Sequence, residues 1–349
     1  MSELEQAIHP ASRPRHVHIV GSIGLETNTD VFKRLTATFP SQLLRIPDGE
    51  TGDRFNFVGW QKQSFKPWLV KWGPESVQEE PSEPWSLEPI NVRYDDAALQ
   101  SYQEFCRLRN DGIIPKGMRF QVCLPTPVNV MATTVLPKYQ VQLEPLYEKA
   151  LIAAARRIQD NIPKEDLAIQ WDMALDVGLI EFAQFESRPK WKPWWLSDHW
   201  FSPVKEGVIE RATRVMKSID QDVSMGVHLC YGDRMHQHFI QPKDLGLLVE
   251  LVNTISAGVG RDFEWIHMPV PKDRLDEAYY APLKDLKLGP DGELVLGLVH
   301  GGDLEGTEKR IEIARKFGKN FAVATECGMG RTKKDEFDSV LEIMAAVTT

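Results

Sequence analysis

The chain has 349 residues, of which 42% are hydrophobic and 26% are charged, a composition typical of a globular protein with a sizeable core. Lys and Arg number 41 against 50 Asp and Glu, which gives a formal net charge of −9 at pH 7. This balance argues against general binding to nucleic acid, because neutralising phosphates requires a basic surface. Small molecules are therefore the expected partners.

The N-terminal residues 1–16 are polar and lack the apolar stretch of a secretory signal. No apolar run in the sequence approaches the length of a membrane span, so we expect no membrane partner. The expected location is the reducing cytoplasm. The four cysteines are then expected to be free thiols or metal ligands rather than a disulfide framework. They are Cys106, Cys123, Cys230 and Cys327.

Eight short apolar runs predict β-strands, and most are separated by amphipathic, helix-like stretches. In chain order they are residues 16–22, 43–46, 118–124, 167–172, 223–230, 262–268, 293–300 and 320–327. Strands that alternate with helices predict right-handed crossovers and a parallel sheet. Eight such units favour a closed (β/α)8 TIM barrel, formed as a single domain over residues 1–349. The helix after the sixth run is weakly marked, which leaves an open doubly wound sheet as the alternative.

Two segments interrupt this alternation. Residues 51–92 are rich in Pro, Trp and Glu, and residues 181–201 carry a cluster of tryptophans. Loops of this length are usually lids or binding loops, so we predict two excursions near the catalytic rim. The tryptophans either cover a flat, apolar substrate or pack beneath a long loop. They are Trp191, Trp194, Trp195 and Trp200.

Polar residues end four of the predicted strands: His228 with Cys230, then His267, His300 and Cys327. In a (β/α)8 barrel the carboxyl ends of the strands converge on the rim that carries the active site. His228 and Cys230 are two residues apart on one strand and so face the same way. Cys and His are common ligands of catalytic zinc, so we predict a zinc site at this rim. The alternative is that each cysteine is a small buried hydrophobe.

Four further residues are candidates for binding or catalysis. Glu50 follows the second strand, where it forms part of a turn or contacts a substrate ammonium group. Asp172 interrupts an apolar strand, and a buried carboxylate needs a partner or a task. His300 is placed to act as a general acid or base, or else bonds to a loop. Arg331 is a candidate for holding an anionic group of the substrate.

These residues resemble the C-terminal catalytic barrel of cobalamin-independent methionine synthase and its short, core-type relatives, within the superfamily of uroporphyrinogen decarboxylase-like and methionine synthase-like barrels. The resemblance extends in patches over nearly the whole chain. It implies that Ser22 lies at the substrate, that Glu50 and Asp172 hold a substrate amino group, and that His300 assists transfer. The matching motifs are Gly21-Ser22, Asp48-Gly49-Glu50, Gln170-Trp171-Asp172, His228-Leu229-Cys230, Gly297-Leu298-Val299-His300 and Glu326-Cys327-Gly328.

Two of the chain's departures from the family concern the proposed ligands and carboxylates. His267 stands where the family has its glutamate zinc ligand, so His267 is the expected fourth ligand, with Glu264 or an open position as alternatives. The family's Asp-Glu-Pro is Asp172-Met173-Ala174 here, which removes one carboxylate. These departures weigh against homocysteine and a folate methyl donor. Other members of the wider group alkylate different thiols, as in epoxide transfer to coenzyme M.

The leading hypothesis is a zinc-dependent transferase that activates a substrate thiol for methylation or alkylation, since a thiol bound to zinc is deprotonated outright. Glu50 and Asp172 would orient the substrate, and His300 would carry a proton. The alternative is a lyase, decarboxylase or hydrolase acting on a small secondary metabolite, with the same three residues as acid–base groups. A third hypothesis is a relative that binds a ligand without catalysis.

Overall fold

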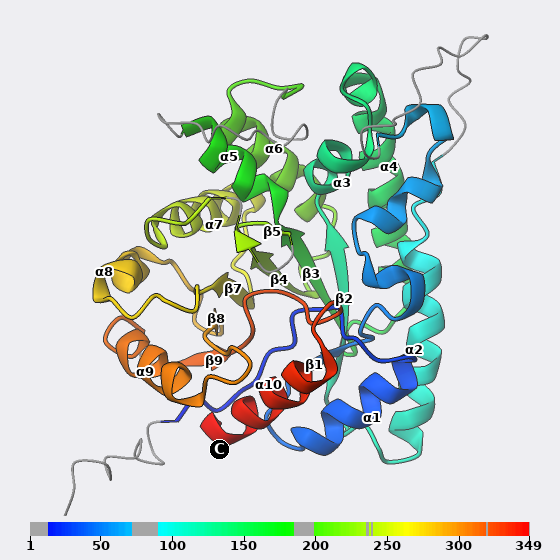
Figure 1. The fold of residues 1–349 in the computed structure, drawn as a ribbon. Coiled ribbons are helices and arrows are strands. Elements are labelled where there is room, and N and C mark those ends of the chain that lie inside the picture. The colour runs from blue at the N-terminus through cyan, green and yellow to red at the C-terminus, as the bar shows by residue number, and fades with distance from the viewer. Residues whose placement is uncertain are drawn as a thin grey trace, which may run out of the picture.

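The computed structural model describes residues 13–71, 90–184, 199–234, 237–238, 240–318 and 320–348. They form an α/β fold in which helices surround a curled parallel sheet (Figure 1). The sheet has seven strands, and a separate hairpin joins β5 (Asp233–Arg234) to β6 (Gln237–His238). In their order across the sheet the seven are β1 (Arg45–Pro47), β2 (Arg119–Pro125), β3 (Leu167–Met173), β4 (Ser224–Leu229), β7 (Trp265–Pro269), β8 (Glu293–Gly297) and β9 (Phe321–Val323).

Helices connect successive strands and pack on the outer face of the sheet (Figure 1). The helix expected to be weak, after the sixth predicted strand, is short: α8 has four residues and a 3-10 turn follows it. The α-helices are α1 (Asn28–Thr38), α2 (Tyr94–Asn110), α3 (Pro127–Thr134), α4 (Pro137–Asn161), α5 (Leu175–Gln184), α6 (Val204–Met216), α7 (Gly246–Val259), α8 (Glu277–Tyr280), α9 (Leu304–Ala314) and α10 (Lys334–Val347). The 3-10 helices are η3 (Gly52–Phe55), η4 (Gly59–Ser64), η5 (Pro67–Leu69) and η7 (Ala281–Asp285).

The predicted parallel α/β sheet is confirmed, with one difference at its first strand. Residues 16–22 form only an isolated bridge, in which Val17 pairs with Val323 of β9. On its other side Val17 donates its N–H to the carbonyl of Gln42, ahead of β1, at 3.0 Å. Further along, the carbonyls of this segment accept hydrogen bonds from the side-chain amides of Gln121 and Gln170. Side chains thus replace the ladder bonds that a full strand would need.

The sheet separates two hydrophobic cores. The larger core lies between the strands and the helices, whereas a small inner core occupies the concave face of the sheet. Trp265 dominates this inner core, and a Cβ at Gly226 on the neighbouring strand would come within 2.1 Å of its indole. Because side chains alternate along a strand, Trp265 and His267 share the inner face, as do Ala168, Gln170 and Asp172. The inner core consists of Val20, Ala168, Trp265, Val295, Ala322 and Ala324.

The two predicted excursions are described in part. Residues 51–71 form short 3-10 helices whose Trp60, Phe65 and Leu69 are buried. Residues 72–89 and 185–198, which include Trp191, Trp194 and Trp195, lie outside the described residues. Trp200 packs edge-to-face on Phe201 and donates its indole N–H to Glu144 at 2.6 Å. Trp200 therefore packs against the protein, which is one of the two roles expected for the tryptophan cluster.

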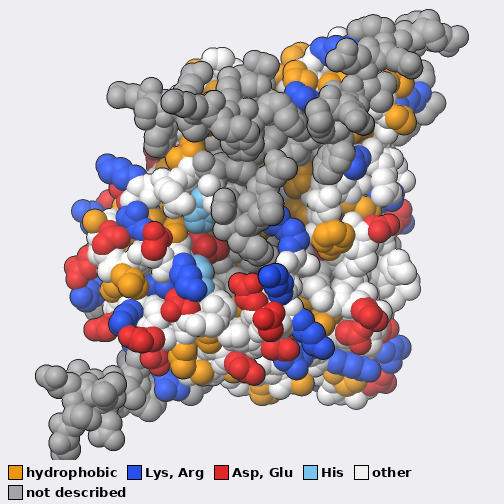
Figure 2. Space-filling view, viewed as in Figure 1, with side chains coloured by type: hydrophobic (Ala, Val, Ile, Leu, Met, Phe, Trp, Pro, Cys, Tyr) orange, Lys and Arg blue, Asp and Glu red, His pale blue; other side chains and the backbone are white. Residues whose placement is uncertain are grey.

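The described surface carries charges of both signs. Figure 2 shows acidic and basic side chains intermingled over α1, α9 and α10 on the face viewed. Within the described ranges, no helix combines the length and the hydrophobicity that a membrane span requires.

Candidate metal centre

Three of the predicted ligands meet at the carboxyl end of the sheet. His228 lies near the end of β4, Cys230 follows that strand, and Cys327 lies in the loop after β9. One ligand atom from each lies within 4.8 Å of the other two. Zinc bonds of about 2.0–2.3 Å imply ligand separations near 3.5 Å, so small side-chain movements would close this set around an ion. The cluster could therefore hold a metal.

His267 lies behind His228 and is not a member of this cluster. Its Nε2 lies 2.9 Å from the carbonyl of Thr325, and its Nδ1 lies 2.6 Å from Nδ1 of His228. Burial holds the pKa of His267 well below its ordinary value, so the ring is neutral. A carbonyl only accepts hydrogen bonds, so Nε2 of His267 must carry the proton and its Nδ1 must accept. His228 therefore donates from Nδ1, which leaves its Nε2 lone pair available for a ligand.

The pKa of the Cys327 thiol is lowered well below its ordinary value. The main cause is a hydrogen bond with Cys230, and His228 and the charge of Arg331 act in the same direction against the opposing effect of burial. The loop is further fixed by Thr325, whose hydroxyl donates to the carbonyl of Cys327 at 2.7 Å. Cys327 is therefore suited to bind a metal, because cysteine binds metals in its deprotonated form.

A second group on the same rim consists of Glu50, Cys123 and Asp172. All three are buried, and one ligand atom from each lies within 4.8 Å of the other two. Burial raises the pKa of Glu50 to about 8, and burial together with Glu50 raises the pKa of Asp172 well above its ordinary value. Asp172 pairs in register with His228 across β3 and β4, so the two groups are neighbours.

The turn that carries Glu50 is fixed by its own sequence. Gly49 has a φ of +79°, and a Cβ there would lie 2.6 Å from Val31 of α1, so only glycine fits without strain. Glu50 itself has a φ of 50°, and its N–H donates to Asp48 at 2.9 Å. The carboxylate of Asp48 is paired with Arg54 at 2.6 Å.

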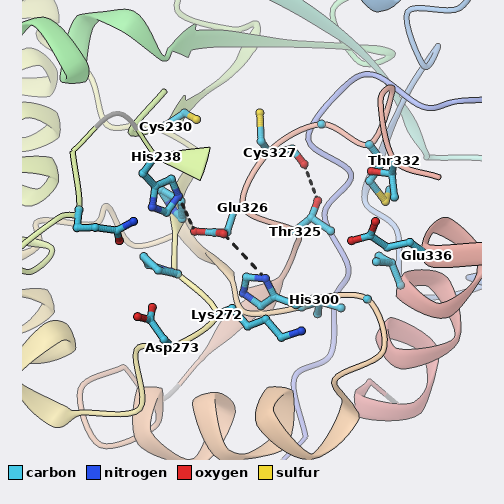
Figure 3. Close-up of a pocket in the computed structure, with 18 residues that line it drawn as sticks. Cys230, His238, Lys272, Asp273, His300, Thr325, Glu326, Cys327, Thr332 and Glu336 are labelled. Carbon is cyan, nitrogen blue, oxygen red and sulfur yellow. Dashed lines mark hydrogen bonds and ion pairs between the residues drawn. The ribbon is translucent and has the colours of Figure 1, made fainter. Parts of the chain in front are cut away.

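A cavity of about 690 Å³ opens beside the two cysteines, on the side of β7, β8 and β9 (Figure 3). Within it His238 and His300 both point toward Glu326, at 3.2 and 3.9 Å. His300 donates from Nε2 to the carbonyl of Val270 at 3.0 Å, which leaves Nδ1 facing Glu326. Burial lowers the pKa of His300. Both predicted roles of His300 are thus compatible with its position: Nε2 bonds to a loop, and Nδ1 faces the cavity, where a general acid or base would act.

The remaining candidates take different places. Ser22 supports the loop after β9, because its carbonyl accepts from Met329 at 2.7 Å and a Cβ on Gly328 would lie 2.4 Å from its hydroxyl. Arg331 is exposed. Glu264 lies just before β7, whereas the cluster lies beyond the opposite ends of the strands, so the structure separates it from the metal group.

Two residues of the site were missed as functional candidates in the sequence. The sequence offers Cys123 only as one of four cysteines expected to be free thiols or metal ligands, and Glu326 only as part of a motif. Both carry the same signal as the ligands that were identified, namely a polar or reactive side chain at the end of an apolar strand. Of two further histidines that follow the fifth predicted strand, His238 lines the cavity and His236 lies outside the described residues.

No protein-family model matches the chain, and no curated protein matches its sequence. Its fold, however, is similar to those of several solved structures. A protein from Listeria monocytogenes described as a vitamin-B12-independent methionine synthase has 15% identity and a TM-score of 0.52, with 96% of this chain and 98% of that one covered. A B12-independent methionine synthase from Shewanella sp. W3-18-1, in complex with selenomethionine, has 15% identity and a TM-score of 0.54, with 98% and 97% covered. A methyltransferase from Methanosarcina mazei has 14% identity and a TM-score of 0.51, with 97% and 95% covered. Over nearly its whole length, the chain shares the fold of B12-independent methionine synthases and of this methyltransferase.

Proposed function

We propose that the protein is a zinc-dependent transferase that activates a substrate thiol for methylation or alkylation. The observation that carries the proposal is the meeting of His228, Cys230 and Cys327 beside a large cavity. Two sulfurs and one imidazole nitrogen suit zinc, and three protein ligands leave a fourth position for a substrate. A zinc ion bound here would supply the acidity that deprotonates a substrate thiol at neutral pH.

His267 would act as a positioning residue for this site rather than as its fourth ligand. Both of its ring nitrogens are engaged, by His228 and by Thr325. Ligating histidines usually donate their second nitrogen to such a partner, which fixes the tautomer and the orientation of the ring. Where the family has a glutamate that binds the metal, His267 would instead hold the ring of His228 in place. The fourth coordination position of the metal would then be left to the substrate.

The two substrates would lie on opposite sides of the cysteines. Glu50 and Asp172, on the side of β1 and β3, would hold a cationic group of the thiol substrate. The electrophile would occupy the cavity beside His300, whose Nδ1 is placed to exchange a proton with the leaving group. Ser22 would support the loop of Cys327, and Arg331 would attract an anionic group at the rim. The fold shared with methionine synthases and a methyltransferase supports group transfer as the reaction class.

Metal analysis after chelator-free purification tests the proposal. We expect about one tightly bound zinc per chain. The Cys230→Ser and Cys327→Ser variants should lose it, whereas Cys106→Ser on α2 should retain it. An absence of zinc from the wild type would remove the basis of the proposal.

The reaction class is tested by thiol dependence. Homocysteine with a folate methyl donor is one pair to assay, followed by other thiols with other electrophiles. Turnover of a substrate without any added thiol would favour the lyase, decarboxylase or hydrolase alternative, in which Asp172, Glu50 and His300 act as acid–base groups.

A further inference from the structure

We infer that Glu50, Cys123 and Asp172 form a second cation site, which takes a divalent cation of borderline softness such as zinc. Its three residues come from neighbouring parts of the sheet: Glu50 follows β1, Cys123 lies within β2 and Asp172 lies within β3. One ligand atom from each lies within 4.8 Å of the other two, and all three side chains are buried. None of them belongs to the His228–Cys230–Cys327 cluster.

The Glu50 carboxylate points to a missing ligand. Glu50 is 4% exposed, and among the described residues no hydrogen bond or ion pair joins its carboxylate to another group, although the charge of Arg54 lowers its pKa against the larger effect of burial. The guanidinium of Arg54 is taken by Asp48, with contacts at 2.6 and 3.4 Å. The hydroxyl of Ser101 also donates to Oδ2 of Asp48, at 2.6 Å. A buried carboxylate with no ion pair of its own is costly to ionise, so this group is set up to receive a cation.

Without a cation the Cys123 thiol keeps its proton, because burial and the neighbouring Asp172 and Glu50 raise its pKa well above its ordinary value. The thiol donates this proton to the carbonyl of Val20 at 3.4 Å. A bound cation would supply the opposite charge that a thiolate needs here. The side-chain nitrogens of Gln121 and Gln170 lie 3.4 and 3.6 Å from Sγ, farther than the oxygens to which the same amides donate. Gln170 also donates to one carboxylate oxygen of Asp172 at 2.9 Å, which orients that carboxylate and leaves its other oxygen for a ligand. Amide donors that hold the ligands in place are the usual outer partners of a metal site.

A glycine lies directly against two of the three residues. A Cβ at Gly21 would lie 3.2 Å from Oε1 of Glu50 and 3.4 Å from Sγ of Cys123, so an alanine there would press on the Glu50 carboxylate and touch the sulfur. The donor set then selects the cation. Two carboxylate oxygens alone would suit magnesium or an ammonium group, whereas a sulfur ligand favours zinc.

Occupation of this site would regulate the enzyme. On the proposed function, Glu50 and Asp172 hold a cationic group of the thiol substrate, so the second cation and that substrate would exclude each other. Zinc beyond the first equivalent would then inhibit competitively. This consequence rests on the proposed function, whereas the binding of the cation does not.

The test is a calorimetric titration of the full-length, chelator-stripped protein with zinc. We expect two equivalents in the wild type. Cys123→Ser should abolish the second equivalent or weaken it at least about tenfold while preserving the first. Cys327→Ser should do the reverse, and Cys106→Ser, remote from both groups, should bind as the wild type does. Magnesium should not replace zinc at either site.

A second measurement covers variants that fold poorly. Cobalt should give thiolate charge-transfer absorption for two equivalents in the wild type, and the Cys123-dependent part should also fall in Glu50→Gln and in Gly21→Ala, which keeps every ligand. A single equivalent governed by Cys327, or a second one that Cys123→Ser does not change, would overturn the inference and leave the proposed function intact. A single equivalent that is lost in Cys123→Ser and kept in Cys327→Ser would support the second cation site and contradict the proposed function.

Discussion

At the scale of single residues, the chemistry of the site depends on which ring nitrogens carry protons. Only one assignment satisfies both short contacts of His267, because the carbonyl of Thr325 cannot donate. Strand alternation in the sequence predicts that His228 and His267 face the interior, and this much is correct. It cannot predict that His267 bonds to His228, because that depends on the register between β4 and β7, where the two residues are paired.

We expect His267→Phe to weaken zinc binding about 10- to 100-fold, since it removes the acceptor for His228 Nδ1. His267→Asn should recover part of the affinity, because its side-chain oxygen occupies nearly the place of Nδ1. Competition with a chromophoric chelator measures both constants, and thermal unfolding checks that the two variants lose similar stability. Equal losses of affinity, with altered cobalt spectra in both, would instead indicate that His267 is a ligand.

Glu50 should make the stability of the metal-free protein depend on pH. Its pKa is raised from 4.5 to about 8 in the folded chain, so the folded state binds the extra proton between these values. The free energy of unfolding therefore falls as the pH rises through this window, by up to about 1.4 kcal/mol per unit. Glu50→Gln should remove that slope, so its advantage over the wild type should grow from pH 5 to pH 8 in urea unfolding. A constant difference would contradict the assignment.

At the scale of elements, the strands were predictable because parallel strands are buried on both faces and read as continuous apolar runs. All seven residues of β3 are buried, as the run 167–172 predicts. The first run looked the same in the sequence but forms only a bridge, because Gln121 and Gln170 bond its carbonyls. Those contacts join residues more than 100 positions apart, and no local pattern reveals them.

The turn between β1 and η3 should be sensitive to a single methyl group. Gly49→Ala should cost about 1–2 kcal/mol for its left-handed backbone and a further 1–3 kcal/mol for the overlap with Val31. Gly112→Ala is the matched control, since Gly112 has a φ of +75° and nothing within 4 Å of its added Cβ. Chemical denaturation should show a larger loss for Gly49→Ala, and Val31→Ala in the same chain should recover part of it. Equal losses at the two glycines would show that the overlap costs nothing.

At the scale of the whole molecule, Cys230 and Cys327 line an open cavity, whereas Glu50 and Asp172 are buried and do not line it. Residues from the loops after β4, β7, β8 and β9, together with α10, line that cavity. The sequence identified the rim, because strand ends converge in this kind of fold. It did not reveal which of these residues line the cavity, because the lining comes from loops far apart in the chain.

His300→Gln should slow the chemical step about 10²- to 10⁴-fold while leaving the zinc content unchanged. The glutamine amide can still donate to the carbonyl of Val270, so the loop should stay in place, but no nitrogen faces Glu326. The measurement compares the single-turnover rate and the zinc content of the variant with those of the wild type. A variant with full activity would leave His300 with a purely structural role.

Asp172 and His228 occupy the same rung of the β3–β4 ladder. A shift in register between these strands would move the Asp172 carboxylate away from the His228 imidazole. The geometry of the group that contains Asp172 therefore depends on that of the group that contains His228. A substitution that changes the position of one of these groups is therefore expected to change the position of the other as well, unless the pairing of the two strands is altered.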